Sequence, residues 1–148
     1  MPGVKSLQEQ EYYAHPRNAF WQIMKCLLEF DDGLDYTRRL ALIQMHGIAL
    51  WDVAYQCIRP GSLDSEIERN SVIPNEIARL LKATPTITTV CFNGQTAEKL
   101  FKRHFPRLLA SAGINFITLP STSPAHASMK FADKLDAWHI VKEMLHST

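Results

Sequence analysis

The pattern that most limits the fold of this chain is an alternation of strand-like and helix-like segments in its C-terminal half. The runs "ITTVCF" and "INFITL" are short, apolar and rich in β-branched residues, as buried strands are. The segments "NGQTAEKLFKRHF" and "FADKLDAWHIVKEML" follow them and repeat apolar residues at helical spacing. A strand, a helix and a second strand in this order form a crossover, which makes the two strands parallel. The sequence therefore predicts an α/β sandwich with a mainly parallel sheet.

Two helices are expected in the first third of the chain. Apolar residues recur at helical spacing from Asn18 until the run "DDG" at residues 31–33 ends the pattern. A second helix begins near Thr37 and carries Met45 on its inner face. Gly47 stands where a left-handed residue would end that helix.

One strand and one helix are expected between these helices and the alternating half. The segment "GIALWDVAYQC" is rich in β-branched and aromatic residues, so a strand is expected from Ile48. It gives way to a loop through residues 59–61, "RPG". A helix over "NEIARLLKA" follows and ends at Thr84, because a residue before a proline is pushed out of the helical region.

Length and composition indicate one globular domain, residues 1–148. The chain is 46% hydrophobic and 21% charged, which is ordinary for a folded soluble protein. No apolar run approaches the roughly 20 residues of a membrane-spanning helix, and "MPGVKSLQEQ" lacks the apolar centre of a secretory signal. We therefore expect a cytoplasmic protein without a membrane partner.

Cysteine spacing and charge exclude further classes of protein. Cys26, Cys57 and Cys91 are widely spaced in apolar runs, which indicates reduced, buried thiols and no metal site. The formal net charge is only +1, so any contact with nucleic acid has to come from a local patch. The basic run "KLFKRHFPR" is one such patch, although its charge alone is more typical of a solvated helix face.

Polar residues gather in the loops that follow the expected strands. In parallel sheets, ligands bind beyond the carboxyl ends of the strands, so the loops after Leu50, Phe92 and Leu119 should face one cleft. No G-x-S-x-G elbow and no phosphate-binding glycine loop is present. The site is therefore suited to binding and polarising a flat polar ligand. Its expected polar residues are Asn18, Asp52, Asn93, Ser121, Ser123 and His126.

Four segments in this order and spacing resemble the uracil-DNA glycosylase superfamily. They are "MPGVKSLQEQEYYAHPRNAFWQIM", "GIALWDVAYQCIRPGSLDSEI", "FNGQTA" and "LPSTSPAHAS", and together they span nearly the whole chain. Within the superfamily they are most similar to the hypoxanthine-DNA, or deoxyinosine, glycosylases. The resemblance implies a three-layer α/β/α sandwich with a short, mainly parallel central sheet.

The resemblance also implies a reaction. Members flip a damaged nucleotide out of the duplex and hydrolyse its N-glycosidic bond without metal or cofactor, leaving an abasic site. Asn18 in "HPRN" would position the attacking water through its amide oxygen. His126 in "SPAHA" would donate a hydrogen bond to the departing base, and Ser123 would hold that loop or a phosphate. The implied activity is that of a monofunctional DNA-deoxyinosine glycosylase acting on DNA that contains a deaminated base.

Further residues are expected to bind the base or the DNA. Asp52 stands where uracil-specific members carry an asparagine, and a carboxylate would accept from a purine N–H. Tyr13 and Phe20 offer stacking surfaces for a flipped base. The remaining candidates are Gly3 for the base and His15, Arg17, Ser121, Ala125 and Ala127 for the DNA.

The same residues also have plainer, structural interpretations. Asn18 starts a helix and would also serve as its N-cap. His126 would also serve as an ordinary loop histidine that bonds to the backbone. The rings of Tyr12, Phe20 and Trp21 at helical spacing are also typical of a core.

The sequence departs from the family pattern at its N-terminus. Family members place a hydrophobic strand in the middle of the sheet just before "MPG", whereas this chain begins at Met1. Either the true start lies upstream, or the chain has been shortened, or the molecule fills the gap in another way. If the first strand is missing, open strand edges would favour association of an otherwise monomeric protein. An inactive nucleic-acid-binding fragment is therefore one alternative to hypoxanthine excision. A uracil-excising glycosylase is another, because the two bases differ by only one or two groups.

Overall fold

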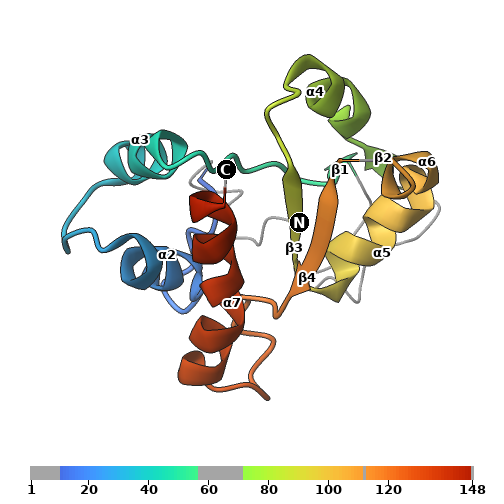
Figure 1. Ribbon diagram of the computed structural model, residues 1–148. Coiled ribbons are helices and arrows are strands. Elements are labelled where there is room, and N and C mark those ends of the chain that lie inside the picture. The colour runs from blue at the N-terminus through green and yellow to red at the C-terminus, as the bar shows by residue number, and fades with distance from the viewer. Residues whose placement is uncertain (1–10, 57–71, 112, 148) are drawn as a thin grey trace. The chain divides into compact units, whose positions relative to one another are not determined.

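The computed structural model describes residues 11–56, 72–111 and 113–147 (Figure 1). These residues form two compact units. One unit lies within residues 52–121, and the other combines residues 11–51 with residues 122–147. The elements in chain order are α2 (Phe20–Leu28), α3 (Tyr36–Met45), β1 (Ala54–Gln56), β2 (Ile73–Pro74), α4 (Ile77–Ala83), β3 (Thr89–Asn93), α5 (Gln95–His104), α6 (Pro106–Leu109), β4 (Asn115–Leu119) and α7 (Phe131–His146).

The unit of residues 52–121 is built on the parallel pair β3 and β4. Their register runs from Thr89 opposite Asn115 to Asn93 opposite Leu119, so both strands end at the same edge (Figure 1). The crossover between them contains α5, as expected from the alternating sequence pattern. A second, antiparallel pair joins β1 to the two-residue strand β2, which the sequence does not predict.

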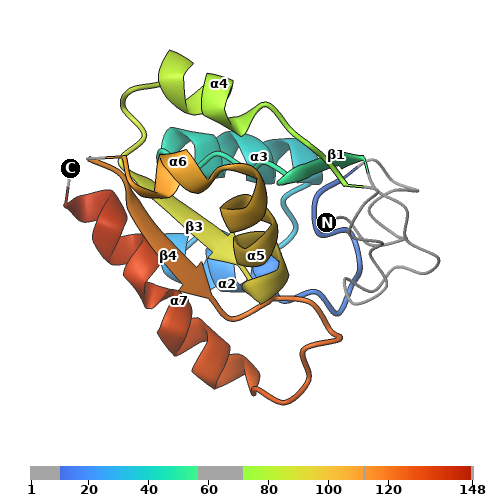
Figure 2. The same cartoon turned by 90° about the vertical axis from the view of Figure 1, so that its right-hand side faces the viewer.

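Helices cover one face of the parallel pair with an apolar core. Ile77 of α4, Phe92 of β3 and Phe101 of α5 are buried together, and the rings of Phe92 and Phe101 lie 5.0 Å apart. Phe116 of β4 stacks on Phe92 with centroids 6.2 Å apart. Because residues two apart on a strand share a face, Val90 packs against the same core. Figure 2 shows α5 lying across β3 and β4.

The other unit is helical and is centred on the packing of α2 against α7. Four residues at helical spacing, Phe20, Ile23, Met24 and Leu27, form the buried face of α2. Phe20 meets Trp138 of α7 edge to face, with centroids 6.0 Å apart. The two helices are in contact and lie next to each other in Figure 1.

Helix α3 ends in a Schellman motif that involves Gly47. The Gly47 backbone has φ +84 and its N–H donates to the Gln44 carbonyl, while the N–H of Ile48 donates to the Ile43 carbonyl. The expected glycine cap is therefore confirmed. The strand expected from Ile48 is wrong, because the helix end uses that N–H, and β1 begins only at Ala54.

Three expectations about burial are wrong. Met45 is 87% exposed, because its position lies off the stripe that buries Ile43. Cys26 is exposed because it falls outside the buried face of α2. Cys91 is exposed because it alternates with buried Phe92 along β3.

The remaining elements agree with the sequence-based expectations. Helix α4 ends at Ala83 with Thr84 as its C-cap, and β3, α5, β4 and α7 occupy the expected segments. The α/β class with a short parallel sheet is confirmed. The three-layer arrangement and the single domain stay predictions. Cys57, Gly3 and the "RPG" loop lie outside the described residues. Within the described part of the chain, no helix is both long and apolar enough to span a membrane.

Candidate active site

The segment "HPRN" folds into a tight turn that ends at Asn18. The N–H of Asn18 donates to the carbonyl oxygen of His15 at 2.9 Å, which closes a four-residue β-turn. Pro16 occupies the second position of the turn, where its fixed φ is favoured. The N–H of Arg17 donates to Nδ1 of His15 at 3.1 Å, so the ring carries a proton on Nε2 when it is neutral. Arg17 and Pro16 are exposed at the tip of this turn.

The side chain of Asn18 bonds to the first residue of α2. Its Oδ1 accepts the N–H of Phe20 at 3.0 Å, which is an Asx turn. The N-cap residue of α2 is Ala19, so the plainer interpretation of Asn18 as the N-cap is wrong by one position. An amide oxygen has two lone pairs, and this bond uses one of them. This bond thus fixes the orientation of the Asn18 amide without exhausting its capacity to accept a second hydrogen bond.

The segment "SPAH" forms a β-turn of the same kind. The N–H of His126 donates to the carbonyl oxygen of Ser123 at 3.0 Å, and Pro124 again holds the second position. The Ser123 hydroxyl accepts the N–H of Ala125 at 3.2 Å, which stiffens the turn from inside. His126 is half-buried at the last position, as Asn18 is in the other turn.

A backbone hydrogen bond joins the two turns. The N–H of Ala19 donates to the carbonyl oxygen of Thr122 at 3.0 Å. Thr122 is 1% exposed, so this bond is shielded from water. Ala19 follows Asn18 and Thr122 precedes Ser123 directly. The structure therefore brings together two segments that lie far apart in the sequence.

Tyr13 occupies a strained backbone position beside these turns. Its φ of 58 is left-handed, which is costly for a residue with a bulky side chain. The ring stacks on Phe20 with centroids 4.1 Å apart. Phe20 is 2% exposed whereas Tyr13 is half-buried, so Tyr13 is the ring that presents surface outward. The stacking role of both rings stays a prediction.

Contacts from Tyr36 of α3 and Trp21 of α2 hold the backbone of Tyr12 in place. The Tyr36 hydroxyl accepts the N–H of Tyr12 at 3.0 Å, and Nε1 of Trp21 donates to the Tyr12 carbonyl at 3.1 Å. The Arg39 guanidinium lies 4.9 Å from the centroid of the Trp21 ring. Sequence reasoning missed Tyr36 and Arg39, because nothing in a helical pattern tells which partner a polar side chain meets in space.

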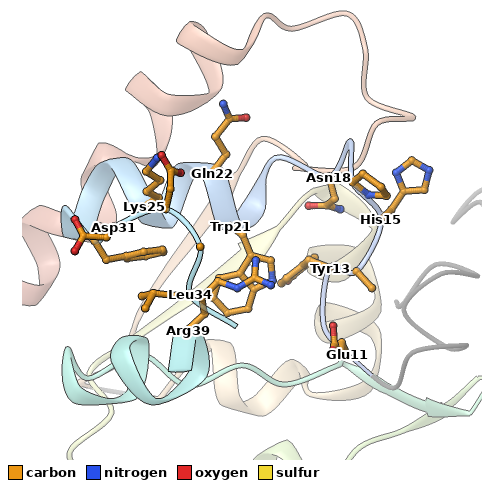
Figure 3. Close-up of a pocket in the computed structure, with 15 residues that line it drawn as sticks. Glu11, Tyr13, His15, Asn18, Trp21, Gln22, Lys25, Asp31, Leu34 and Arg39 are labelled. Carbon is orange, nitrogen blue, oxygen red and sulfur yellow. The ribbon is translucent and has the colours of Figure 1, made fainter. Parts of the chain in front are cut away.

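A pocket of about 490 Å³ lies between these residues and the segment after α2. Figure 3 shows Asn18 and His15 at one end, Lys25 and Asp31 at the other, and Trp21 between them. The lining residues are Glu11, Tyr13, Ala14, His15, Pro16, Asn18, Trp21, Gln22, Lys25, Phe30, Asp31, Asp32, Gly33, Leu34 and Arg39. The pocket is mixed in charge and carries one amide whose orientation is fixed.

Two curated proteins are similar to this chain over most of its length. A hypoxanthine DNA glycosylase of Methanosarcina acetivorans is 31% identical over 127 residues, which are 85% of this chain and 76% of that protein. The chain belongs to the hypoxanthine DNA glycosylase family. A hypoxanthine DNA glycosylase of Methanosarcina barkeri is 29% identical over 131 residues, 88% of this chain and 79% of that protein. No family model matches the sequence.

The expected site residues of this glycosylase family member fall in both units. Asn18, Tyr13, Phe20, His15 and Arg17 lie with Ser123 and His126 in the helical unit. Ala125 and Ala127 are exposed on the second turn and its continuation. Asp52 and Ser121 belong to the sheet-containing unit, so their placement relative to Asn18 stays a prediction.

Within the sheet-containing unit of this chain, two expected loops do meet. Gly94 follows β3 with φ +97, and its N–H donates to the Leu119 carbonyl at 2.9 Å. A Cβ on Gly94 would lie 3.0 Å from Cβ of Ser121, so only glycine allows this approach. The convergence of the loops after Phe92 and Leu119 is therefore confirmed. Asn75 Nδ2 donates to the Asp52 carbonyl at 2.7 Å, which fixes the backbone before β1.

The described part of the chain contains no group of three or more histidine, cysteine or acidic side chains arranged to hold a metal ion. Among these residues, no hydrogen bond to the ring of His126 is found. The polar groups gathered by the two turns are thus an amide, a hydroxyl and an imidazole.

Proposed function

We propose that this protein is a DNA glycosylase that hydrolyses the N-glycosidic bond of a deaminated base. The proposed base is hypoxanthine in deoxyinosine, and the product is an abasic site. The observation that carries the proposal is the hydrogen bond between Ala19 and Thr122, because it places the Asn18 turn beside the Ser123–His126 turn. The two hypoxanthine DNA glycosylases of Methanosarcina support the same choice of reaction and base.

Asn18 would position the water that attacks the sugar. In this reaction, positive charge develops on the sugar as the bond to the base stretches, so a weakly activated water is a sufficient nucleophile. An amide cannot remove a proton as a strong base, but its oxygen can hold a water in line with the breaking bond. Because Oδ1 of Asn18 is fixed by the N–H of Phe20, the orientation of that water would be set before substrate binds.

His126 would act on the other side of the N-glycosidic bond, on the departing base. Negative charge develops on the base as it leaves, and a ring N–H aimed at the base would stabilise that charge. The turn that ends at His126 is closed by its own backbone bond to Ser123, so the imidazole is carried on a rigid support. Neither residue needs a metal or an organic cofactor for this role.

Recognition of the flipped base would combine stacking with one acceptor. Tyr13 presents a ring beside Asn18, and its strained backbone is typical of functional positions. Asp52 would accept the N–H of a purine, which a uracil carbonyl cannot offer at that place. His15 and Arg17, on the neighbouring turn, would contact the DNA backbone.

Strand scission by alkali after incubation with the protein tests this proposal. Three matched duplexes are needed, carrying deoxyinosine, deoxyuridine or an undamaged base at one position. We expect scission of the deoxyinosine duplex above that of the other two. Preferential scission of the deoxyuridine duplex would indicate a uracil-excising enzyme. Binding of all three duplexes without scission would indicate a non-catalytic binding module.

A further inference from the structure

The main chain of Tyr12 is held by side chains from two helices. Its N–H donates to the hydroxyl of Tyr36 on α3 at 3.0 Å. Its carbonyl oxygen accepts the N–H of Trp21 Nε1 on α2 at 3.1 Å. These two groups belong to the peptide planes before and after the Cα of Tyr12, so the two bonds orient both planes.

The second of these planes leads directly into the strained position of Tyr13. The φ angle of Tyr13 is a torsion that starts at the carbonyl carbon of Tyr12, and its value of 58 is costly for a bulky side chain. Such a torsion persists only where the surrounding contacts over-determine it. On one side of it the Tyr12 carbonyl bonds to Trp21, and on the other the Tyr13 ring stacks on Phe20 with centroids 4.1 Å apart.

The ring and the hydroxyl of Tyr36 make separate contacts. The ring meets Trp21 edge to face, with centroids 5.9 Å apart and an interplanar angle of 88°. A phenylalanine ring would pack in the same way. The hydroxyl instead accepts the Tyr12 N–H in a part-buried bond, and a donor that loses such an acceptor is destabilised. Removal of the oxygen alone therefore releases the Tyr12 main chain and leaves the ring contact in place.

Tyr36 acts on the pocket only at second hand. Tyr13 and Asn18 line the pocket of about 490 Å³, whereas Tyr36 is not among the described residues that line it (Figure 3). An effect of the Tyr36 hydroxyl on a ligand in this pocket therefore passes through the main chain of Tyr12 to the ring of Tyr13.

We propose that Tyr36 is a positioning residue for recognition of the flipped base. Its hydroxyl holds the Tyr12 main chain in the orientation that keeps the Tyr13 ring on Phe20, where the ring is ready to stack on a purine. A ring that is already fixed loses less conformational freedom when the base arrives than a mobile ring does. This inference rests on the proposed function, because it takes the ligand of Tyr13 to be the flipped base.

Binding to two duplexes measures this role without base excision. One duplex carries 2′-fluoro-deoxyinosine, whose electron-withdrawing fluorine slows cleavage of the N-glycosidic bond, and the other carries a tetrahydrofuran analogue of the abasic site, which has no base. The ratio of their dissociation constants is measured for the parent, Tyr36→Phe, Tyr13→Leu and the double variant. Asp35→Ala is the matched control, because it removes the N-cap bond of α3 directly beside Tyr36 and no atom of the bond to Tyr12.

We expect Tyr13→Leu to weaken binding of the base-containing duplex about tenfold relative to the abasic duplex, because a stacking ring is lost. Tyr36→Phe should weaken it about threefold, because the ring is displaced and not removed. The double variant should match Tyr13→Leu, because the effects of residues that act through one another do not add. Asp35→Ala should keep the parent ratio.

A parent-like ratio in Tyr36→Phe or in Tyr13→Leu would overturn the proposal. Equal weakening of both duplexes by Tyr36→Phe would also overturn it, because the hydroxyl would then support the fold and not the base contact. Additive losses in the double variant would do the same, because the two residues would then act independently. Release of hypoxanthine from a deoxyinosine duplex by the parent is measured in parallel. Its absence refutes the proposed function, whereas release together with a parent-like ratio in Tyr36→Phe refutes the positioning role alone.

Discussion

The backbone N–H of Ala19 donates to the carbonyl oxygen of Thr122 at 3.0 Å. This bond joins the residue after Asn18 to the residue before Ser123, so it sets the spacing between the two proline-containing turns. Each turn ends in a side chain with a proposed part in catalysis. The site thus depends on one main-chain contact, which a substitution breaks only if it removes the Ala19 N–H.

Replacing Ala19 with proline tests that contact, because proline has no N–H. Ala19 has φ −79 and ψ −5, which proline tolerates at a helix start. We expect Ala19→Pro to lower the free energy of unfolding by about 1 kcal/mol and excision by about tenfold. Ala19→Ser, which keeps the N–H, is the control. Parent-like excision by Ala19→Pro in a single-turnover assay would show that the contact does not set the site.

Alanine substitutions of Gly94 and Gly113 compare the stability cost of a side chain at two glycines of the sheet-containing unit. Both have left-handed backbones, with φ +97 and +92, but only Gly94 faces a close neighbour, Ser121 at 3.0 Å. Gly113→Ala should lower the free energy of unfolding by about 1 kcal/mol through backbone strain alone. Gly94→Ala should lower it by about 2–3 kcal/mol, because the Ser121 loop must also move. Denaturant unfolding measures both, and equal losses would contradict the packing argument.

Much of the fold could be predicted from the sequence, because its longer helices and strands carry periodic apolar patterns. β3, β4, α5 and α7 each carry a pattern that local physics decides, so these elements are where the sequence predicts them. Ile48 did not follow its strand propensity, because its N–H completes the end of α3. Cys91 did not follow its hydrophobicity, because the strand period assigns burial to its neighbour Phe92.

Part of the candidate site could likewise be predicted from the sequence, and part could not. Local bonding places Asn18 and His126 at the ends of their turns, and proline in each turn signals this. The bond from Ala19 to Thr122 is a long-range contact that no local pattern encodes. The burial of Lys134 was not predicted either, because lysines are mostly exposed and this packing exists only in the folded chain.

The depressed pKa of Lys134 predicts how stability changes with pH. Below its folded pKa the amine is charged in both states, and folding bears the cost of burying the charge. As pH rises from the folded pKa toward the ordinary value of 10.5, the unfolded chain binds more protons, so the parent gains stability. Lys134→Met should lack this gain and be at least as stable as the parent at pH 7.

Denaturant midpoints of the parent and of Lys134→Met, measured from pH 7 to pH 10.5, check this sign. The advantage of Lys134→Met should shrink as pH rises. A variant that is strongly destabilised at pH 7 would indicate that Lys134 has a structural role instead. Lys142→Met should follow the parent over the same range, because its position is partly exposed.

Asp52→Asn tests the base-reading role of this side chain. The backbone of Asp52 is held through its carbonyl by Asn75, so the substitution leaves that bond in place. An amide can donate to a uracil carbonyl, whereas a carboxylate only accepts. We expect the ratio of hypoxanthine to uracil excision to fall by about tenfold, measured on matched duplexes under single-turnover conditions. An unchanged ratio would remove Asp52 from base recognition.

The central claim is that Asn18 positions the attacking water, and Asn18→Ser tests it most directly. Serine can accept the N–H two residues ahead, as Ser123 does for Ala125, so the bond to the Phe20 N–H should remain. Its hydroxyl is too short to hold a water where the amide does. The measurement is the single-turnover rate of hypoxanthine excision from a deoxyinosine duplex, beside the free energy of unfolding. We expect the rate to fall at least about a hundredfold with unfolding nearly unchanged. A parent-like rate in Asn18→Ser would contradict the assigned mechanism.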